Sequence, residues 1–431
     1  MSAMGWTICL MILGTVMVFL TAVYYIRRGS LDVFDPFYWV FAIYFVVMVF
    51  APYTWVKEGK IDWYGAVVLE NLPVASLYFG LSFLLYFLGS IVKSKGANST
   101  VLPKRAYSLQ ERNVIRRTAW IMYLIGLLVY SAYLAYRGRS LITALSLGQF
   151  GEFSEDLSSK ASFWFLNQGT RIVLCASLVL LIFEKRHRLM AILAYVIGFM
   201  LILSSGQRNQ LMVAVLAPII LYYFHKNKRP KIIKIVAFCL AFVVILGYIG
   251  MWRRSFRSGG ALEAKSFDEI ITAFMVNVEI FFPYYTLLTT VPAYFPHQFG
   301  MSYLYTFIQF IPRFIWNSKP VSAVTSVMIA MFGPTRAAWG PAYPNFAEMY
   351  LDFGLPGMMV GMYIFARICR KIYSAAILNQ EDELGLISFS LFLPYLFQYI
   401  TRGHFPSIIT EVVFLWGTIW VIKLVLHVKW R

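Results

Sequence analysis

The sequence predicts an all-α membrane protein that crosses the bilayer many times, and three observations support this. Hydrophobic residues make up 60% of the 431 residues, whereas charged residues make up only 13%. Aromatic residues reach 18%, as expected for a protein with many rings at the headgroup boundary. Apolar runs of about 20 residues, the length of a transmembrane helix, recur along the whole chain. No soluble domain is therefore expected.

Thirteen apolar stretches are candidate spans, so we expect about 11–14 transmembrane helices in one domain of residues 1–431. The stretches are residues 5–26, 33–53, 70–92, 118–136, 161–183, 189–205, 209–225, 232–251, 269–291, 299–316, 345–366, 385–401 and 405–426. The first is too long for the apolar part of a signal peptide, so we expect a retained helix. Several prolines make 269–316 either two spans or a broken, re-entrant pair.

The basic residues indicate the orientation of the chain. Of the 38 Lys and Arg, 23 fall in alternate connections between the apolar stretches. Because the side richer in Lys and Arg faces the cytoplasm, we expect the N-terminus outside and the C-terminus inside. The connection 317–344 is then a long periplasmic or outer loop. Its apolar middle, residues 321–332, is expected to lie on the outer leaflet, either as a flexible lid or as a structural plug.

Other functional classes find no support in the sequence. The net charge of +18 does not indicate nucleic acid, because the basic residues form short clusters between apolar runs. The four cysteines show no CxxC spacing, so neither a disulfide nor a zinc site is expected. GxGxxG, P-loop, HExxH and GxSxG motifs are absent. No DxD-type acidic pair lies on the outer side, so a nucleotide sugar held by a metal is not indicated.

Several arginines are predicted at the outer edge of the membrane, where the positive-inside rule disfavours them. They are Arg208, Arg253, Arg254, Arg257, Arg313, Arg336 and Arg402. The planar guanidinium fork suits phosphate oxygens, so a converging set indicates an anionic ligand bound at the outer leaflet. The alternative interpretation is contact with lipid headgroups together with ordinary loop charge.

Two charges fall well inside apolar stretches. Arg171 and Glu279 each need a partner or a wet cavity, because an unpaired charge in the bilayer is costly. The two residues are expected to pair with each other. Such an ion pair would serve either structure or catalysis.

Four polar residues lie near the predicted outer ends, and three of them, Glu348, Asp352 and His404, are candidates for proton transfer. Asn345, Glu348 and Asp352 share one face at the start of a helix. A capping box would explain Asn345 and Glu348 without any catalytic role, whereas Asp352 lies a turn deeper. His404, beside Arg402, could move a proton near neutral pH, or it could simply hold a hydrogen bond.

Four short segments, in this order, resemble the Wzy-type polysaccharide repeat-unit polymerases. They are SSGQRNQL at 204–211, FIPRFIWNSKP at 310–320, PNFAEMYLDFG at 344–354 and TRGH at 401–404. The resemblance covers roughly residues 200–410. It implies a GT-C-like helical architecture and a glycosyltransferase at the outer face of the bacterial cytoplasmic (inner) membrane.

The same resemblance implies the substrates and the roles of residues. Both substrates would be oligosaccharides linked to undecaprenyl pyrophosphate, with no metal or other cofactor and with membrane lipid around them. A regulator of polysaccharide chain length would be a further partner. Arginines would contact the pyrophosphate leaving group, and an acidic residue or a histidine would orient or deprotonate the acceptor hydroxyl. The arginines are Arg208, Arg402, Arg313, Arg253 and Arg254, and the proton-transfer candidates are Glu348, Asp352 and His404.

Two other functions are weighed against polymerisation. An O-antigen ligase uses the same donor and has similar hydropathy. A lipid-linked oligosaccharide flippase or other transporter would gather its polar residues near the midplane. In this sequence most of the unusual charges lie at the outer edge, which favours an enzyme acting there.

Overall fold

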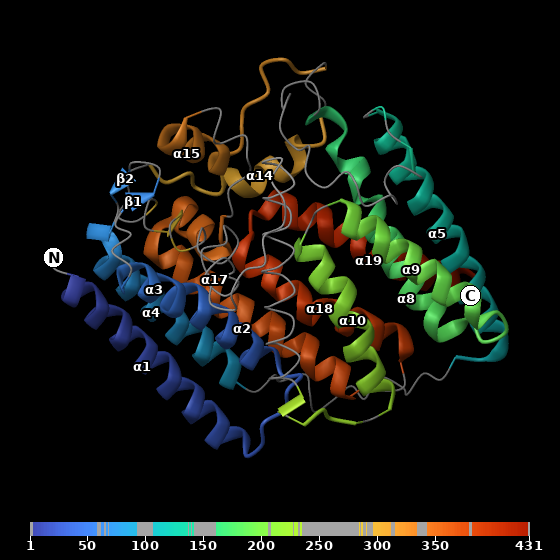
Figure 1. Cartoon of the computed structure of the whole chain (residues 1–431), viewed down its shortest axis with the longest axis horizontal. Coiled ribbons are helices and arrows are strands. Elements are labelled where there is room, and N and C mark those ends of the chain that lie inside the picture. Colours follow the sequence, from blue (N-terminus) through green and yellow to red (C-terminus); the bar gives the residue numbers. More distant parts are fainter. Residues whose placement is uncertain are drawn as a thin grey trace, which may run out of the picture.

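Helices dominate the chain in the computed structural model (Figure 1). The structure describes residues 3–57, 62–63, 66–67, 69–92, 107–136, 138, 140–141, 161–205, 208–226, 228–231, 233–234, 284, 286–287, 290, 296–311, 315–333, 343–378 and 382–429. Within these ranges, eight helices are long and apolar enough to cross a membrane. The prediction of an all-helical, polytopic membrane protein is therefore confirmed.

The elements follow the apolar stretches closely. In chain order the helices are α1 (Ala3–Arg28), α2 (Pro36–Phe45), η1 (Val46–Phe50), α3 (Ala51–Lys57), η2 (Leu69–Asn71), α4 (Leu72–Ile91), α5 (Leu109–Tyr136), η4 (Ala161–Gln168), α8 (Gly169–Phe183), α9 (Arg188–Ser204), α10 (Arg208–His225), α14 (Met301–Ile308), α15 (Ala323–Phe332), α17 (Asn345–Leu378), α18 (Glu383–Thr401) and α19 (Phe405–Lys429). Two short antiparallel strands, β1 (Asp62–Trp63) and β2 (Ala66–Val67), follow α3.

Local sequence sets where the helices begin. Asp35 caps α2, since its Oδ1 accepts a hydrogen bond from the Phe37 N–H at 3.0 Å, and Pro36 occupies the first turn. Before α5, Ser108 and Glu111 form a reciprocal capping box, with distances of 2.9 and 3.2 Å. Short polar signals of this kind separate one apolar helix from the next.

Glycines allow the helices to pack closely. A Cβ on Gly89 of α4 would lie 2.7 Å from the carbonyl oxygen of Tyr363 in α17, so only glycine fits there. Gly169 of α8 likewise lies against Gly126 of α5, where an added Cβ would be 2.6 Å from the Gly126 carbonyl oxygen. Small residues matter at these contacts because lipid tails are as apolar as the helices and give no hydrophobic drive to associate them.

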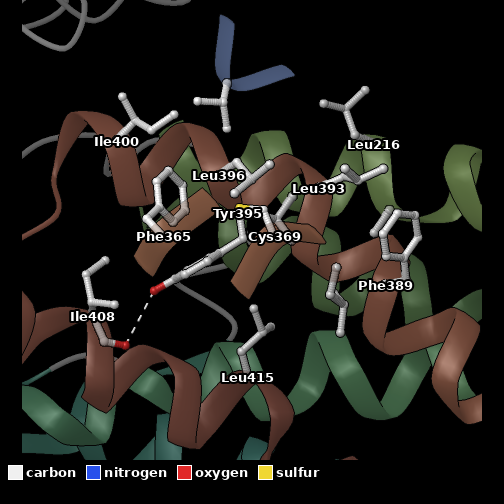
Figure 2. Packing of buried hydrophobic residues seen from close by; sticks show 14 of the residues in the cluster. Leu216, Phe365, Cys369, Phe389, Leu393, Tyr395, Leu396, Ile400, Ile408 and Leu415 are labelled. Carbon is white, nitrogen blue, oxygen red and sulfur yellow. Dashed lines mark hydrogen bonds between the residues drawn. The ribbon is translucent and has the colours of Figure 1, made fainter. Parts of the chain in front are cut away.

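Aliphatic and aromatic side chains fill the space between the helices. Figure 2 shows the part of this core around α18, where the Tyr395 ring lies among buried side chains such as Leu396 and Leu415. The Tyr395 hydroxyl oxygen lies 3.5 Å from the Ile408 carbonyl oxygen. By contrast, α1 leaves Met11 and Phe19 more than half exposed, as expected of side chains that face lipid.

Two ion pairs link connections that the distribution of basic residues predicts on the same side of the membrane. Arg229 pairs with Asp32 at 3.1 Å, and Arg112 pairs with Glu383 at 2.7 Å. Each pair joins two connections that were predicted to share the cytoplasmic side. The grouping of these connections at one end of the bundle therefore agrees with the structure. Which end faces the cytoplasm stays a prediction.

The stretch 299–316 is not a spanning helix, so the interpretation as two full spans is wrong for this part. Its helix, α14, has eight residues, a length of about 12 Å at the rise of an α-helix, far short of a bilayer. Both α14 and α15 lie at one end of the bundle (Figure 1). The structure does not describe residues 235–283, so the predicted spans at 232–251 and 269–291 lie largely outside the described residues.

α15 occupies the apolar middle of the predicted loop 317–344. Ser322 caps its start, since the Ser322 Oγ accepts a hydrogen bond from the Thr325 N–H at 3.1 Å. Lys319, almost buried, donates to the carbonyls of Gln309 and Ile311 at 2.8 and 2.9 Å, which holds the segment after α14. Whether α15 acts as a lid or as a plug stays a prediction.

Candidate functional site

The candidate site lies beside a break in helix α17. Gly354 has φ 64° and ψ −159°, which interrupts the helix and separates residues 345–353 from the longer part that follows. A Cβ at this position would also lie 3.0 Å from the His297 ring. Glycine is required because this backbone conformation is essentially closed to other residues. Residues 345–353, called the half-helix below, carry three of the polar residues singled out from the sequence.

Glu348 of the half-helix ties α17 to the start of α19. Its Oε1 lies 2.9 Å from Nδ1 of His404, and its Oε2 accepts the Phe405 N–H at 2.7 Å. Its side chain is almost fully buried. Both carboxylate oxygens are therefore used by the junction between α18 and α19, 56 and 57 residues further along the chain.

The capping box suggested for Asn345 and Glu348 is not formed, because Glu348 caps a different helix. The Asn345 Oδ1 instead accepts hydrogen bonds from the Tyr44 hydroxyl at 3.0 Å and from the Phe346 N–H at 2.9 Å. Asn345 also packs against Gly403, where an added Cβ would lie 2.4 Å from the Asn345 Cβ. These contacts hold the half-helix against α2 and against the loop that carries His404.

His404 has a defined orientation. The Glu348 carboxylate can only accept hydrogen bonds, so the close Nδ1 carries the ring proton in this pair. The other nitrogen, Nε2, is then the basic atom. About one fifth of the side chain is exposed, compared with 2% for Glu348, so a substrate can reach the ring. A carboxylate that orients a histidine in this way is the usual arrangement of a general base.

Asp352 is placed differently from Glu348. It is fully buried, and its Oδ1 accepts hydrogen bonds from the N–H groups of Gly300 and Ser302 at 3.1 and 3.4 Å. These groups lie at the first turn of α14, so Asp352 caps that helix. The carbonyls of Leu351 and Asp352 also accept from Gln298 and Phe299. Asp352 thus holds α14 on the half-helix.

Tyr303 of α14 lies beside the same residues. Its ring meets the Phe405 ring edge to face, with a centroid distance of 4.6 Å. Burial raises the pKa of the Tyr303 hydroxyl, and the charges of Glu348 and Asp352 raise it further. The hydroxyl is therefore neutral at physiological pH and can donate a hydrogen bond.

A buried charged network lies next to this junction. Arg171 pairs with Glu411 of α19 at 2.6 Å, and both side chains are nearly buried. Gln398 and Tyr395 of α18 also donate to Glu411. Arg402 lies close enough to act electrostatically on the Glu411 carboxylate. The network therefore joins α8, α18 and α19 beneath the loop that carries His404.

The partner of Arg171 in the described part of the chain is a residue that the sequence analysis did not name. The expected partner, Glu279, lies outside the described residues, so that pairing stays a prediction. The carboxylate that the structure places against Arg171 is Glu411, which sequence reasoning missed. The signal was available, because Glu411 is an acidic residue inside the apolar stretch 405–426.

Only part of the predicted arginine set can be placed. Arg402 follows α18 directly, and Arg208 is the first residue of α10, with only its backbone described. Two residues after Arg208, Gln210 accepts a hydrogen bond at 3.2 Å from Thr170, the neighbour of Arg171. The starts of α8 and α10 therefore lie together. The predicted positions Arg253, Arg254, Arg257, Arg313 and Arg336 lie outside the described residues.

The described residues contain no group of three or more His, Cys, Asp or Glu side chains that could hold a metal ion. The junction supplies several side chains of its own. These are a histidine in contact with a carboxylate, a neutral tyrosine and at least one arginine.

Comparison with known proteins decides between the functional classes. The family model described as O-antigen polysaccharide polymerase Wzy matches residues 4–430, nearly the whole chain. The chain belongs to this family. The Wzy assignment confirms the predicted polymerisation of O-antigen repeat units, and nothing found favours the ligase or the flippase. It also implies a lipid-linked oligosaccharide substrate within the membrane.

No curated protein and no solved structure matches this Wzy-family chain. The GT-C-like architecture therefore stays a prediction. So do the roles of individual residues, which rest on the contacts described above.

Proposed function

We propose that this Wzy-family chain transfers a growing glycan from undecaprenyl pyrophosphate to an incoming lipid-linked repeat unit. The reaction would take place at the outer face of the bacterial cytoplasmic membrane, the side of the Glu348–His404 pair. The N-terminus would then lie outside and the C-terminus inside. The observation that carries the proposal is this pair, whose His404 lies two residues after Arg402.

In the proposed mechanism, His404 acts on the acceptor. Its Nε2 takes the proton of the acceptor hydroxyl while that oxygen bonds to the anomeric carbon of the donor sugar. The bond from this carbon to the pyrophosphate oxygen breaks, and the leaving group departs with the electron pair. Glu348 holds the ring and favours the imidazolium that forms. The contacts of Asp352 support a role in positioning α14 instead of in proton transfer.

Arginines would stabilise the charge that develops on the pyrophosphate. Arg402 lies at the junction itself, and the Thr170–Gln210 hydrogen bond supports the presence of Arg208 nearby. Arg313, Arg253 and Arg254 are proposed to complete the set. A regulator of polysaccharide chain length is proposed as a partner of the polymerase.

The experiment that tests this function combines the purified full-length chain with lipid-linked repeat units and follows the ladder of products. A lysine keeps the charge of Arg402 or Arg208 but loses the two-pronged hydrogen bonding. We expect Arg402→Lys and Arg208→Lys to lower turnover by about tenfold or more, because a contact that tightens in the transition state acts on turnover.

Arg367→Lys is the matched control, since Arg367 lies near the other end of α17 and donates to the Val92 carbonyl. It should leave the ladder unchanged. Normal ladders from both Arg402→Lys and Arg208→Lys would refute the pyrophosphate contact. The absence of any ladder from the unaltered protein would contradict the proposed donor.

A further inference from the structure

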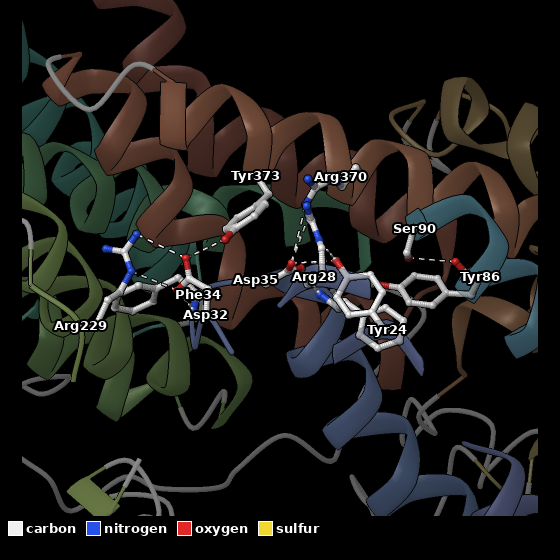
Figure 3. A network of polar contacts seen from close by, with 11 residues as sticks. Tyr24, Arg28, Asp32, Phe34, Asp35, Tyr86, Ser90, Arg229, Arg370 and Tyr373 are labelled. Atoms are coloured by element: carbon white, nitrogen blue, oxygen red, sulfur yellow. Dashed lines mark hydrogen bonds and ion pairs between the residues drawn. The ribbon is translucent and has the colours of Figure 1, made fainter. Parts of the chain in front are cut away.

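A second polar centre lies at the end of the bundle opposite His404. Arg28 at the end of α1, Asp32 and Asp35 before α2, and Arg370 and Tyr373 near the end of α17 meet there (Figure 3). They line a cavity of about 300 Å³ together with Ser30, Ser374, Ile377 and Leu378. The proposed polymerase mechanism makes no use of this cavity.

The two carboxylates of this cavity already have close hydrogen-bond donors. Asp32 accepts from Tyr373 at 2.6 Å, from Arg229 at 3.1 and 3.4 Å, and from the Phe34 N–H at 3.0 Å. Asp35 accepts from the Tyr24 hydroxyl at 2.7 Å and from the Phe37 N–H at 3.0 Å. Little capacity remains on either residue for a cationic ligand.

The two arginines of the cavity have weaker contacts by comparison. In the part of the chain that the structure describes, Arg28 uses only its Nε, which donates to the Tyr24 hydroxyl at 3.3 Å. Arg28 and Arg370 approach Asp35 only at 3.6 and 3.7 Å, beyond ordinary hydrogen-bond length. The Nη1 of Arg370 is the atom that faces Asp35 Oδ2 at 3.7 Å; it is buried and has no hydrogen-bond partner among the described residues. A guanidinium held only by so long a contact gains from a closer acceptor, which a ligand in the adjoining cavity can supply.

We propose that this cavity binds a phosphate group, held between the guanidinium groups of Arg28 and Arg370. Two guanidinium groups in one cavity present several N–H donors. A phosphate has enough oxygens to accept from both groups, whereas a ligand with a single acceptor does not. The hydroxyls of Ser30 and Ser374 provide further donors at the cavity wall. The phosphate belongs either to a lipid headgroup or to a free phosphate ion.

The surroundings of the cavity suit either source. It lies at the end of the bundle, at the level where the spanning helices α1 and α17 terminate. Ile377 and Leu378 form its apolar wall, and Leu378 is 53% exposed, so an acyl chain could lie beside a bound headgroup. A bound phosphate would tie the ends of α1 and α17 together.

Binding is tested on the purified full chain in a neutral detergent without phosphate buffer. The probes are inorganic phosphate and dihexanoyl phosphatidylglycerol, and the readout is the rise of unfolding temperature with probe concentration, since a ligand of the folded state stabilises it. We expect saturable stabilisation, with Arg370→Gln and Arg28→Gln weakening the apparent affinity by about tenfold or more.

Arg367→Gln is the matched control, because it removes the same charge from the same helix outside the cavity. It should change the affinity by less than about twofold, as expected for an exposed charge. If Arg370→Gln does not fold, Arg370→Lys retains the charge, loses the fork and should weaken binding similarly.

The two probes distinguish the sources. Saturable binding of inorganic phosphate shows that the ion suffices, whereas binding of the lipid alone identifies the headgroup, and both results support the site. Equal weakening by Arg367→Gln and Arg370→Gln would show general electrostatic attraction and overturn the proposal. So would the absence of saturable binding by either probe. Neither result depends on polymerase activity.

Discussion

At the scale of single residues, the contact between Glu348 and His404 allows a direct test of whether His404 is a base or a structural histidine. If His404 takes the proton, His404→Ala should lower turnover by about a hundredfold or more, and added imidazole should restore part of it. His427→Ala is the control, since His427 is exposed near the far end of α19, the helix that begins directly after His404. Unchanged turnover in His404→Ala would place the base elsewhere.

Glu348→Gln belongs to the same experiment. Glutamine keeps one acceptor for the Phe405 N–H but cannot satisfy both partners as a carboxylate does. We expect turnover to fall strongly while the protein still folds. If Glu348→Gln retains nearly all activity, the carboxylate serves only to hold the junction.

The buried pair Arg171–Glu411 gives a residue-scale prediction about stability. Arg171→Met or Glu411→Gln alone leaves one charge uncompensated, which costs about 3–5 kcal/mol for a buried pair. The double variant removes both charges and should recover folded protein, measured as the monodisperse fraction after heating. A double variant as unstable as the singles would argue against this pairing. Glu279→Gln, assayed in parallel, tests the partner predicted from the sequence.

The sequence singled out most residues of the candidate site, but it did not show which of them contact one another. Glu348 and His404 were separate candidates in the sequence, because residues 56 positions apart give no sign that they meet. Asp352 looked equivalent to Glu348, since both share a helix face. Only the packing of α14 shows that Asp352 caps a helix.

At the scale of elements, the half-helix of α17 and α14 form a unit held by Asp352. Asparagine retains an oxygen that can accept from Gly300 and Ser302, so Asp352→Asn should be mild. Asp352→Ala removes the cap and should cost about 1 kcal/mol, with a corresponding loss of unfolding temperature. Turnover abolished in a folded Asp352→Asn would contradict the capping role and return Asp352 to the catalytic candidates.

Sequence patterns predicted the long helices well and the short ones poorly. Hydropathy identified every spanning helix that the structure describes, because bilayer thickness sets a minimum length. It suggested a span at 299–316, since an apolar surface helix and a spanning one have similar composition. The break in α17 could have been noticed, because Gly354 followed by Pro356 is a common way to end one helix and begin another.

At the scale of the whole molecule, contacts between the connections fix which of them share a side of the membrane. The orientation of the chain can therefore be tested as one prediction. Asp32 contacts both Arg229 and Tyr373, so three connections must share one side of the membrane. Cysteines introduced at Thr100 and Lys231 should react with an impermeant thiol reagent only after cells are permeabilised. Cysteines at Ser258 and Ala330 should react in intact cells, because the side richer in Lys and Arg faces the cytoplasm.

The native cysteines require a background control. Cys175 and Cys369 are buried, so they should contribute little signal, and the unmodified chain measures the remainder. A fully reversed pattern would put the Glu348–His404 pair on the cytoplasmic side and remove the basis for an outer active site. A mixed pattern, with position 231 labelled in intact cells and position 100 not, would contradict the grouping of the connections. The expected pattern leaves one orientation, in which the histidine pair faces outward and the phosphate cavity faces the cytoplasm.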